Sequence, residues 1–418
     1  MVSLTEFIEK KERVNPFTNN LARLNLAFSF SASVFSFALF LFLQTYGIPI
    51  IYGGIGLSAG QLVALILLFT QGRAVDKGHS FTLMITGSVL YGTFLIILFL
   101  TVYNTIFIFI LVPATIAGII VVESTFRTSL NSFVSKSANK NILGSNFSRI
   151  IAAETIGSAA SFAVLAFASY TSYLAFIVIG SGAVLLGFTG LVFFILDSRN
   201  REFIRNEEKK TPRPGLKQSV MALKNKFRFV SIIVSSKAFM NVGSIAFSFF
   251  YVPTGTYMGI PPVLTFSALL VCYVIGALIG RLGEQYIDNN QNFGKMFVAF
   301  VMLFDLIVFT TVLTSMYIAS DILFLAAAIA TIPSPLLISG AMAYETNVVG
   351  KQYRGTFSAI QRTVIGSSSV FVSVGLTALF AIRPILIWWA VSITSSISLI
   401  IAMLLRIRPK LIDDDSIF

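Results

Sequence analysis

Residues 80–101 read SFTLMITGSVLYGTFLIILFLT and contain no charged side chain. A helix of this length spans the roughly 30 Å hydrocarbon core of a bilayer. Residues 94–100 and 106–111 are apolar throughout, whereas a strand of a membrane β-barrel would alternate. Lipid offers no partner to backbone N–H and C=O groups, and a helix satisfies them internally. This stretch therefore predicts a transmembrane α-helix.

Similar apolar stretches recur along the whole chain. Apolar residues make up 56% of it and charged residues 11%, against roughly 25% charged residues in soluble domains. We therefore expect an all-α membrane protein with twelve transmembrane helices arranged as two six-helix bundles. The expected spans are 21–46, 58–72, 80–101, 105–130, 144–169, 172–196, 228–252, 262–283, 294–317, 321–346, 356–381 and 384–406.

The chain has a net charge of +12, and most of its positive residues lie in the termini and in the turns between these spans. Of the 30 Lys and Arg, 25 lie in the termini and the even-numbered turns or at the adjoining edges of spans. Positive charge gathers on the cytoplasmic side of membrane proteins. We expect a multi-pass protein of the cytoplasmic (plasma) membrane with both termini in the cytoplasm, and no nucleic-acid partner.

The longest polar segment divides the chain in two. Ten of these cations fall within Asp197–Arg228. The expected organisation is a cytoplasmic N-terminal segment, a six-helix bundle, a cytoplasmic linker, a second six-helix bundle and a cytoplasmic tail. Their ranges are 1–20, 21–196, 197–227, 228–406 and 407–418. Residues 1–20 hold several charges and no apolar leader core.

The two halves carry a weak internal repeat. A shift of 208 positions maps Gly72, Arg73 and Asp76 onto Gly280, Arg281 and Glu284. The same shift maps a polar stripe of the first helix, Ser29, Ser33 and Ser36, onto Lys237, Asn241 and Ser244 of the seventh. Because each unit has an even number of spans, six, both units start on the same side of the membrane and have the same orientation. Transporters built in this way hold their solute near the midplane between the repeats.

The turn Gly72-Arg73-Ala74-Val75-Asp76-Lys77-Gly78-His79 resembles the signature of the major facilitator superfamily. Gly72, Asp76, Lys77 and Gly78 fit, while His79 stands where Lys or Arg is usual. A fainter match is Arg354-Gly355. The resemblance implies a secondary transporter, not an enzyme, that works by alternating access. It also implies that the first, fourth, seventh and tenth helices line the cavity.

The same resemblance assigns a gating role to this turn. Asp76 would latch the halves together, and the alternative is a solvated turn whose charges only set topology. Residues 154–161 lack the Gly-Pro pair, and residues 113–118 the arginine, of proton-driven drug exporters. Multidrug efflux remains an alternative. A non-transporting scaffold or sensor with the transporter fold is an alternative from another class.

The polar stripes are the expected solute site. Lys237 would lie about two turns inside the membrane, where a charge costs on the order of 2.5–3.5 kcal/mol. Facing the cavity, it would suit an anionic or carboxylate-bearing solute. The alternative is that Lys237 extends to the cytoplasmic interface.

Other intramembrane charges are candidates for proton coupling or ion pairs. Glu123 and Arg127 are four residues apart and share a helix face. Arg149, Glu154 and Arg362 could bond across the interface between halves. Asp305 is either a proton site or a neutral packing acid. Glu345 is expected to join an inner gate with Arg354.

No cofactor or metal is expected. One histidine and one cysteine cannot build a zinc site without several carboxylates. Gly53-Gly54-Ile55-Gly56 is expected in an outer turn and lacks the Lys-Ser/Thr of a phosphate loop. Pro333 and Pro335 should break the tenth helix, and Pro113 the fourth. The expected partners of this monomer are a small-molecule solute, the lipid bilayer and H⁺ as a coupling ion.

The latch interpretation gives a first prediction. Asp76→Asn should slow transport without abolishing solute binding, because it removes the charge that holds the closed state. Uptake rate and equilibrium solute binding, measured on the same preparation, check this. Transport at the normal rate would contradict the latch.

Overall fold

The computed structural model describes residues 16–76, 79–102, 107–137, 143–171, 174–195, 227–283, 286–287, 294–349 and 354–405. Lys77, Gly78, Glu284, the N-terminal residues 1–15, the linker residues 197–226 and the tail 407–418 lie outside this description.

The described chain is a succession of long helices. The first half contains α2 (Pro16–Thr45), α3 (Ile50–Asp76), α4 (Ser80–Val102), α5 (Ile108–Ser137), α6 (Leu143–Thr171) and α7 (Leu174–Ile195). The second half contains α10 (Phe227–Tyr257), α11 (Pro262–Leu282), α13 (Gly294–Tyr317), α14 (Asp321–Ala326), η3 (Ala327–Thr331), α15 (Ser334–Val349), α16 (Arg354–Ile382) and α17 (Pro384–Met403).

Twelve apolar spans result. Eleven of the described helices are long and apolar enough to cross a membrane, with α14, η3 and α15 counting together as one span. The twelfth, α7, has a shorter apolar stretch over Ile177–Gly190. The prediction of an all-α membrane protein is confirmed.

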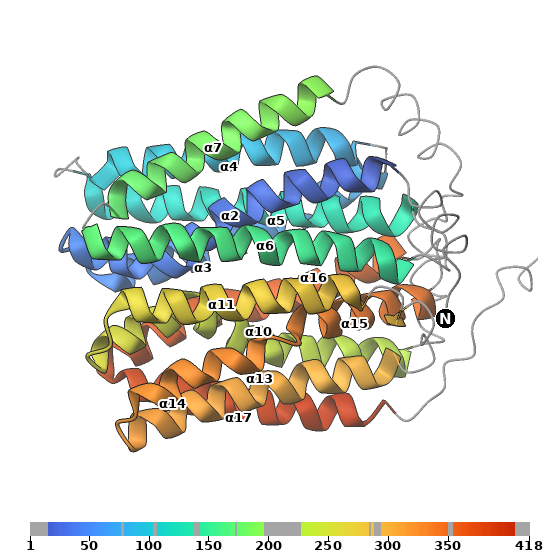
Figure 1. Ribbon diagram of the computed structural model, residues 1–418. Coiled ribbons are helices and arrows are strands. Elements are labelled where there is room, and N and C mark those ends of the chain that lie inside the picture. The colour runs from blue at the N-terminus through green and yellow to red at the C-terminus, as the bar shows by residue number, and fades with distance from the viewer. Residues whose placement is uncertain are drawn as a thin grey trace, which may run out of the picture.

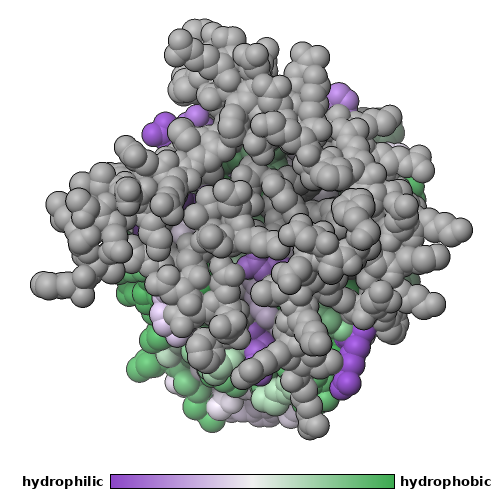
Figure 2. Space-filling view, turned by 90° about the vertical axis from the view of Figure 1, so that its right-hand side faces the viewer, coloured by the Kyte–Doolittle hydropathy of each residue, from purple (hydrophilic) through white to green (hydrophobic). Residues whose placement is uncertain are grey.

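The two halves lie side by side as two bundles (Figure 1). Consecutive spans alternate in direction, so α2 begins and α17 ends at the same end of the molecule. We call this end the terminal face and the opposite end the far face. Figure 2 looks onto the terminal face: hydrophobic residues are visible along parts of its rim, and hydrophilic residues near its centre and at a few points of the rim.

Large apolar side chains cover the sides of the bundle. Phe371 is 79% exposed and Ile110 69%. In water such a surface would be unfavourable, whereas lipid solvates it. The exposed apolar belt is therefore the part of the protein that faces the hydrocarbon core.

The halves meet along two main seams. In one seam α6 packs against α11, and in the other α3 packs against α16. Ser148 of α6 donates a hydrogen bond to the Gly280 carbonyl of α11. Gly54 of α3 lies so close to α16 that an added Cβ would be 2.8 Å from Thr377 Cβ.

The second span begins earlier than expected. Helix α3 starts at Ile50 rather than at residue 58, so Gly53-Gly54-Ile55-Gly56 is helical and not an outer turn. The cause is packing, because these glycines let other helices approach on three sides. A Cβ on Gly53 would meet the Phe40 ring, one on Gly54 would meet Thr377, and one on Gly56 would be 2.8 Å from the Pro113 carbonyl oxygen.

The prolines have different effects. The tenth span is interrupted between η3 and α15, as Pro333 and Pro335 predict. The predicted break at Pro113 is wrong, because α5 runs continuously from Ile108 to Ser137. Pro113 is near the start of that helix, where the packing of α3 against α5 at Gly56 holds the turn in place.

Close packing of α2 on α6 gives a testable consequence. A Cβ on Gly157 would collide with the Leu26 carbonyl oxygen and lie 3.1 Å from Phe30 N. Gly157→Ala should lower the unfolding free energy by about 1–3 kcal/mol, because backbone must move to relieve overpacking. Gly180→Ala is the matched control, since nothing lies within 4 Å of its added Cβ. Equal thermal unfolding midpoints for the two variants would contradict the close approach.

Candidate functional site

A cavity of about 460 Å³ lies between the two halves. Helices α2, α5 and α6 form one wall, and α10, α11, α13, η3 and α15 form the other. Its lining includes Asn131 and Phe147, which are close to the terminal ends of α5 and α6. The cavity therefore extends from the middle of the molecule toward the terminal face.

Aromatic side chains close the path toward the far face. The rings of Phe37 and Phe247 are 6.0 Å apart between centroids, and those of Phe40 and Phe250 are 4.8 Å apart. Each pair joins α2 to α10 across the interface between halves, and all four rings are buried. The structure thus has its central cavity closed on the far side.

The charged centre of the cavity is an ion triad. Arg127 Nε donates to Glu123 Oε1 at 2.8 Å, and Arg127 Nη1 donates to Glu154 Oε1 at 2.7 Å. Helical spacing predicts the first contact. The second depends on how α5 and α6 pack, which spacing along the chain cannot give. One guanidinium thus holds two carboxylates that both line the cavity.

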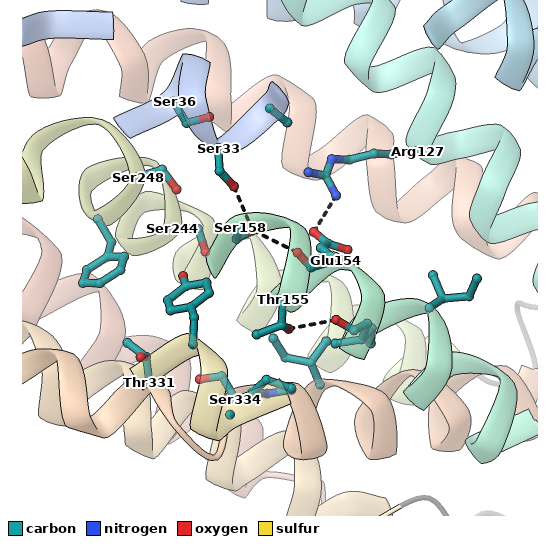
Figure 3. A pocket seen from close by; sticks show the side chains of 18 of the residues that line it. Ser33, Ser36, Arg127, Glu154, Thr155, Ser158, Ser244, Ser248, Thr331 and Ser334 are labelled. Atoms are coloured by element: carbon teal, nitrogen blue, oxygen red, sulfur yellow. Dashed lines mark hydrogen bonds and ion pairs between the residues drawn. The ribbon is translucent and has the colours of Figure 1, made fainter. Parts of the chain in front are cut away.

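Serine hydroxyls continue from this triad (Figure 3). Ser33 Oγ donates to Ser158 Oγ at 2.7 Å, and Ser158 Oγ donates to the Glu154 carbonyl at 3.1 Å. Ser36 also lines the cavity. Ser29 is 1% exposed and lies outside it, packed within the first half. The predicted stripe on α2 therefore divides, with two of its serines in the cavity and one in the core.

The stripe on α10 divides in the same way. Ser244 lines the cavity. Asn241 donates to Ser369 Oγ on α16 at 2.7 Å. Lys237 lies outside the central cavity and pairs with Glu345 Oε2 of α15 at 2.6 Å. Lys237 is about two turns nearer the terminal face than Ser244, and Glu345 is only 4% exposed there.

A second cavity of about 310 Å³ lies between α3, α5, α10 and α16. It shares part of its wall with the first cavity through Ser36, Glu123, Arg127, Ser244 and Ser248. Arg362 lines this second cavity from α16 and donates to the Ser124 carbonyl at 3.4 Å. The triad therefore stands between two chambers, and the contact from Arg362 crosses between halves.

The remaining candidates lie in several places. Asp305 lines the central cavity from α13, together with Thr331 and Ser334, which the sequence analysis did not select. The sequence feature that could have indicated Thr331 and Ser334 is the pair of prolines beside them, Pro333 and Pro335. Arg149 lies outside both cavities.

The gating motif lies toward the terminal face. Gly72, Arg73 and Asp76 are in the last turns of α3, and Gly280 and Arg281 are near the end of α11. Gly280 packs against Pro335: a Cβ added to Gly280 would be only 3.0 Å from the Cβ of Pro335. The side chains of Arg73, Asp76 and Arg354 lie outside the described part of the structure, so their roles stay predictions.

The triad predicts a stability defect that a second change repairs. Arg127→Gln leaves Glu123 and Glu154 without their shared cation, and about 1–2 kcal/mol of stability should be lost after allowing for partial exposure. Thermal unfolding measures this loss. The variant Glu123→Gln/Arg127→Gln/Glu154→Gln is the control and should recover most of the loss, because no unpaired carboxylate remains. An equal loss in the single and the triple variant would argue against the repulsion between the two carboxylates.

Comparisons with known proteins identify the architecture. Residues 21–374 match the family described as Major Facilitator Superfamily. The proton:xylose symporter XylE bound to 6-bromo-6-deoxy-D-glucose aligns with a TM-score of 0.67 at 13% identity, covering 93% of this chain and 94% of that one. A partially occluded inward open XylE from E. coli aligns equally well, with 93% and 98% covered.

At such identity the structural likeness concerns the fold alone. A search of curated proteins found no match to this chain. The family match covers most of the sequence and agrees with the twelve apolar spans and the cavity between two parallel halves. The chain belongs to the Major Facilitator Superfamily, a family of membrane transporters and not of enzymes.

Proposed function

We propose that this protein carries a small polar organic solute across the cytoplasmic membrane by alternating access, with its terminal face in the cytoplasm. The observation that supports this most is the central cavity. Polar side chains from both halves line it, and aromatic pairs close it toward the far face. A site shared by two rigid bundles changes its access when one bundle rocks against the other.

The membrane orientation rests on charge and on aromatic residues. In the sequence, most Lys and Arg adjoin the helix ends that lie at the terminal face, as expected for the cytoplasmic side. At the far end, Trp389 Nε1 donates to Tyr317 Oη at 2.8 Å, and both rings are exposed. Trp and Tyr favour the boundary between lipid and water. These features support cytoplasmic termini and an outer boundary near the end of α13.

The lining indicates the kind of solute. Ser33, Ser36, Ser158 and Ser244 offer hydroxyl groups that can donate and accept hydrogen bonds. Acids outnumber bases in the central cavity, where Arg127 is the one cation among the lining residues. This favours an uncharged or cationic solute. An anionic solute receives less support, because Lys237 is outside the cavity and paired with Glu345.

Multidrug efflux stays the second candidate because of the aromatic lining. The cavity is lined by five aromatic rings as well as by its three acids; the rings are those of Phe37, Phe147, Phe247, Tyr273 and Phe309. Aromatic faces attract organic cations. A lipophilic cation is the solute that this combination would recognise.

Coupling to protons is part of the proposal, with Glu154 as the carrier. Glu154 shares Arg127 with Glu123 and opens onto the cavity. When Glu154 is protonated, one N–H of Arg127 is released for the solute or for Glu123. Protonation would then change both solute binding and the balance between states.

Counterflow in proteoliposomes tests the function. Sugars, amino acids, carboxylates and cationic drugs should be compared, and saturable exchange of one class supports transport. Glu154→Gln should keep counterflow while uptake driven by a pH gradient falls at least about tenfold, since only the driven mode requires proton release. Asp321→Asn, on the exposed first turn of α14, is the control. No exchange of any solute would favour a scaffold or sensor.

A further inference from the structure

Asp305 has no charge partner in the cavity. Five charged side chains line the two chambers among the described residues, and two acids, Glu123 and Glu154, are balanced by Arg127 and Arg362. Asp305 is the fifth. No described residue makes an ion pair or a hydrogen bond with its carboxylate. An ionised carboxylate within a membrane protein requires a compensating cation.

The break in the tenth span lies level with Asp305. Gly340 of α15 packs directly on the Phe297 ring of α13. The two helices run in opposite directions, so Phe297 and Gly340 mark the same height in the bundle. Eight residues closer to the far face, α13 has Asp305, and the tenth span has Ile332. Asp305 is therefore at the height of the turn between η3 and α15.

The same turn packs against α11. The Ile332 carbonyl oxygen would be 2.9 Å from a Cβ added to Gly276, so this oxygen lies against the backbone of α11. Ile332 is not among the residues that line the cavity, whereas its neighbours Thr331, Ser334 and Pro335 are. The turn therefore reaches the cavity through Thr331 and Ser334.

Two hydroxyl groups flank the same turn. Thr331 and Ser334 line one wall of the cavity (Figure 3). Thr331 Oγ1 donates its proton to the Ala328 carbonyl at 2.7 Å, which leaves its oxygen lone pairs to face a ligand. Together with Asp305, they provide a carboxylate and two hydroxyls at one level of the cavity.

We propose that Asp305, Thr331 and Ser334 form a binding site for a monovalent metal cation such as Na⁺, separate from the Glu123–Arg127–Glu154 triad. The donors are all hard oxygens, which suit alkali and alkaline-earth ions. A single carboxylate balances one positive charge, which favours a monovalent ion, and the described residues contain no cluster of three His, Cys, Asp or Glu of the kind that binds a multivalent metal.

The site would make sodium a coupling ion of the proposed transport. Coupling itself rests on the proposed function, whereas cation binding does not. Because α13 and α15 both belong to the second half, a bound ion would fix the broken span at the solute cavity. Solute binding would then depend on sodium through the position of Thr331 and Ser334.

The test measures sodium binding without any solute. Thermal unfolding of the purified full chain is recorded while NaCl replaces choline chloride at constant ionic strength and neutral pH. Sodium should raise the midpoint saturably in the parent protein. Asp305→Asn should abolish the rise, and Ser334→Ala should increase the half-saturating sodium concentration by about tenfold or more. Asp321→Asn, outside the cavity, should leave the response unchanged.

Each other outcome is decisive. No sodium response in the parent protein overturns the proposal, as does an undiminished response in Asp305→Asn. A response to pH alone that Asp305→Asn removes would make Asp305 a proton site instead. If Asp305→Asn does not fold, the Ser334→Ala titration decides. Solute counterflow without a sodium response would refute only the cation site, while a sodium response without counterflow would refute only the transport function.

Discussion

Lipid offers no hydrogen-bond partners, and the organisation of this protein follows from that constraint. Backbone groups inside the bilayer must bond to one another, which makes helices of about 20 residues the repeated unit. Polar side chains face the same requirement. Among the described residues, some bond back to their own helix, as Thr115 does, some bond to a neighbouring helix, as Ser31 and Ser398 do, and others line the cavity between the halves.

The charged residues show the constraint most clearly. Arg127 is bound by two carboxylates, and Lys237 by one. The first cluster is at the wall of both chambers, where water or solute can reach it, and the second is inside the second half. Position, more than composition, separates a group that can take part in transport from one that holds helices together. Lys237 and Arg127 are both charged residues within spans, but of the two only Arg127 lines the central cavity.

Glycine residues allow the helices to pack closely against one another. Without a strong hydrophobic force between helices in lipid, close approach of small residues supplies the contact energy. Gly54 brings α3 onto α16 across the interface between halves, and Gly157 brings α6 onto α2 within the first half. The seams stay narrow in consequence, and the space that remains between the bundles is the cavity. The broken tenth span adds the side chains of Thr331 and Ser334 to the wall of that cavity.

The sequence by itself determined the number of spans and their alternating direction, because hydrophobic length and periodicity are local properties of the chain. It also predicted the pair of Glu123 with Arg127, since four residues make one helical turn. The start of α3 was missed, because a run of glycines reads as a turn until a neighbouring helix is present to pack against it. Only the tertiary structure decided that Glu154 joins Arg127, that Ser29 and Lys237 lie away from the cavity, and that Asp305 faces a broken helix. These facts depend on how helices far apart in sequence are rotated and placed against one another, and the spacing along one helix contains no information about that.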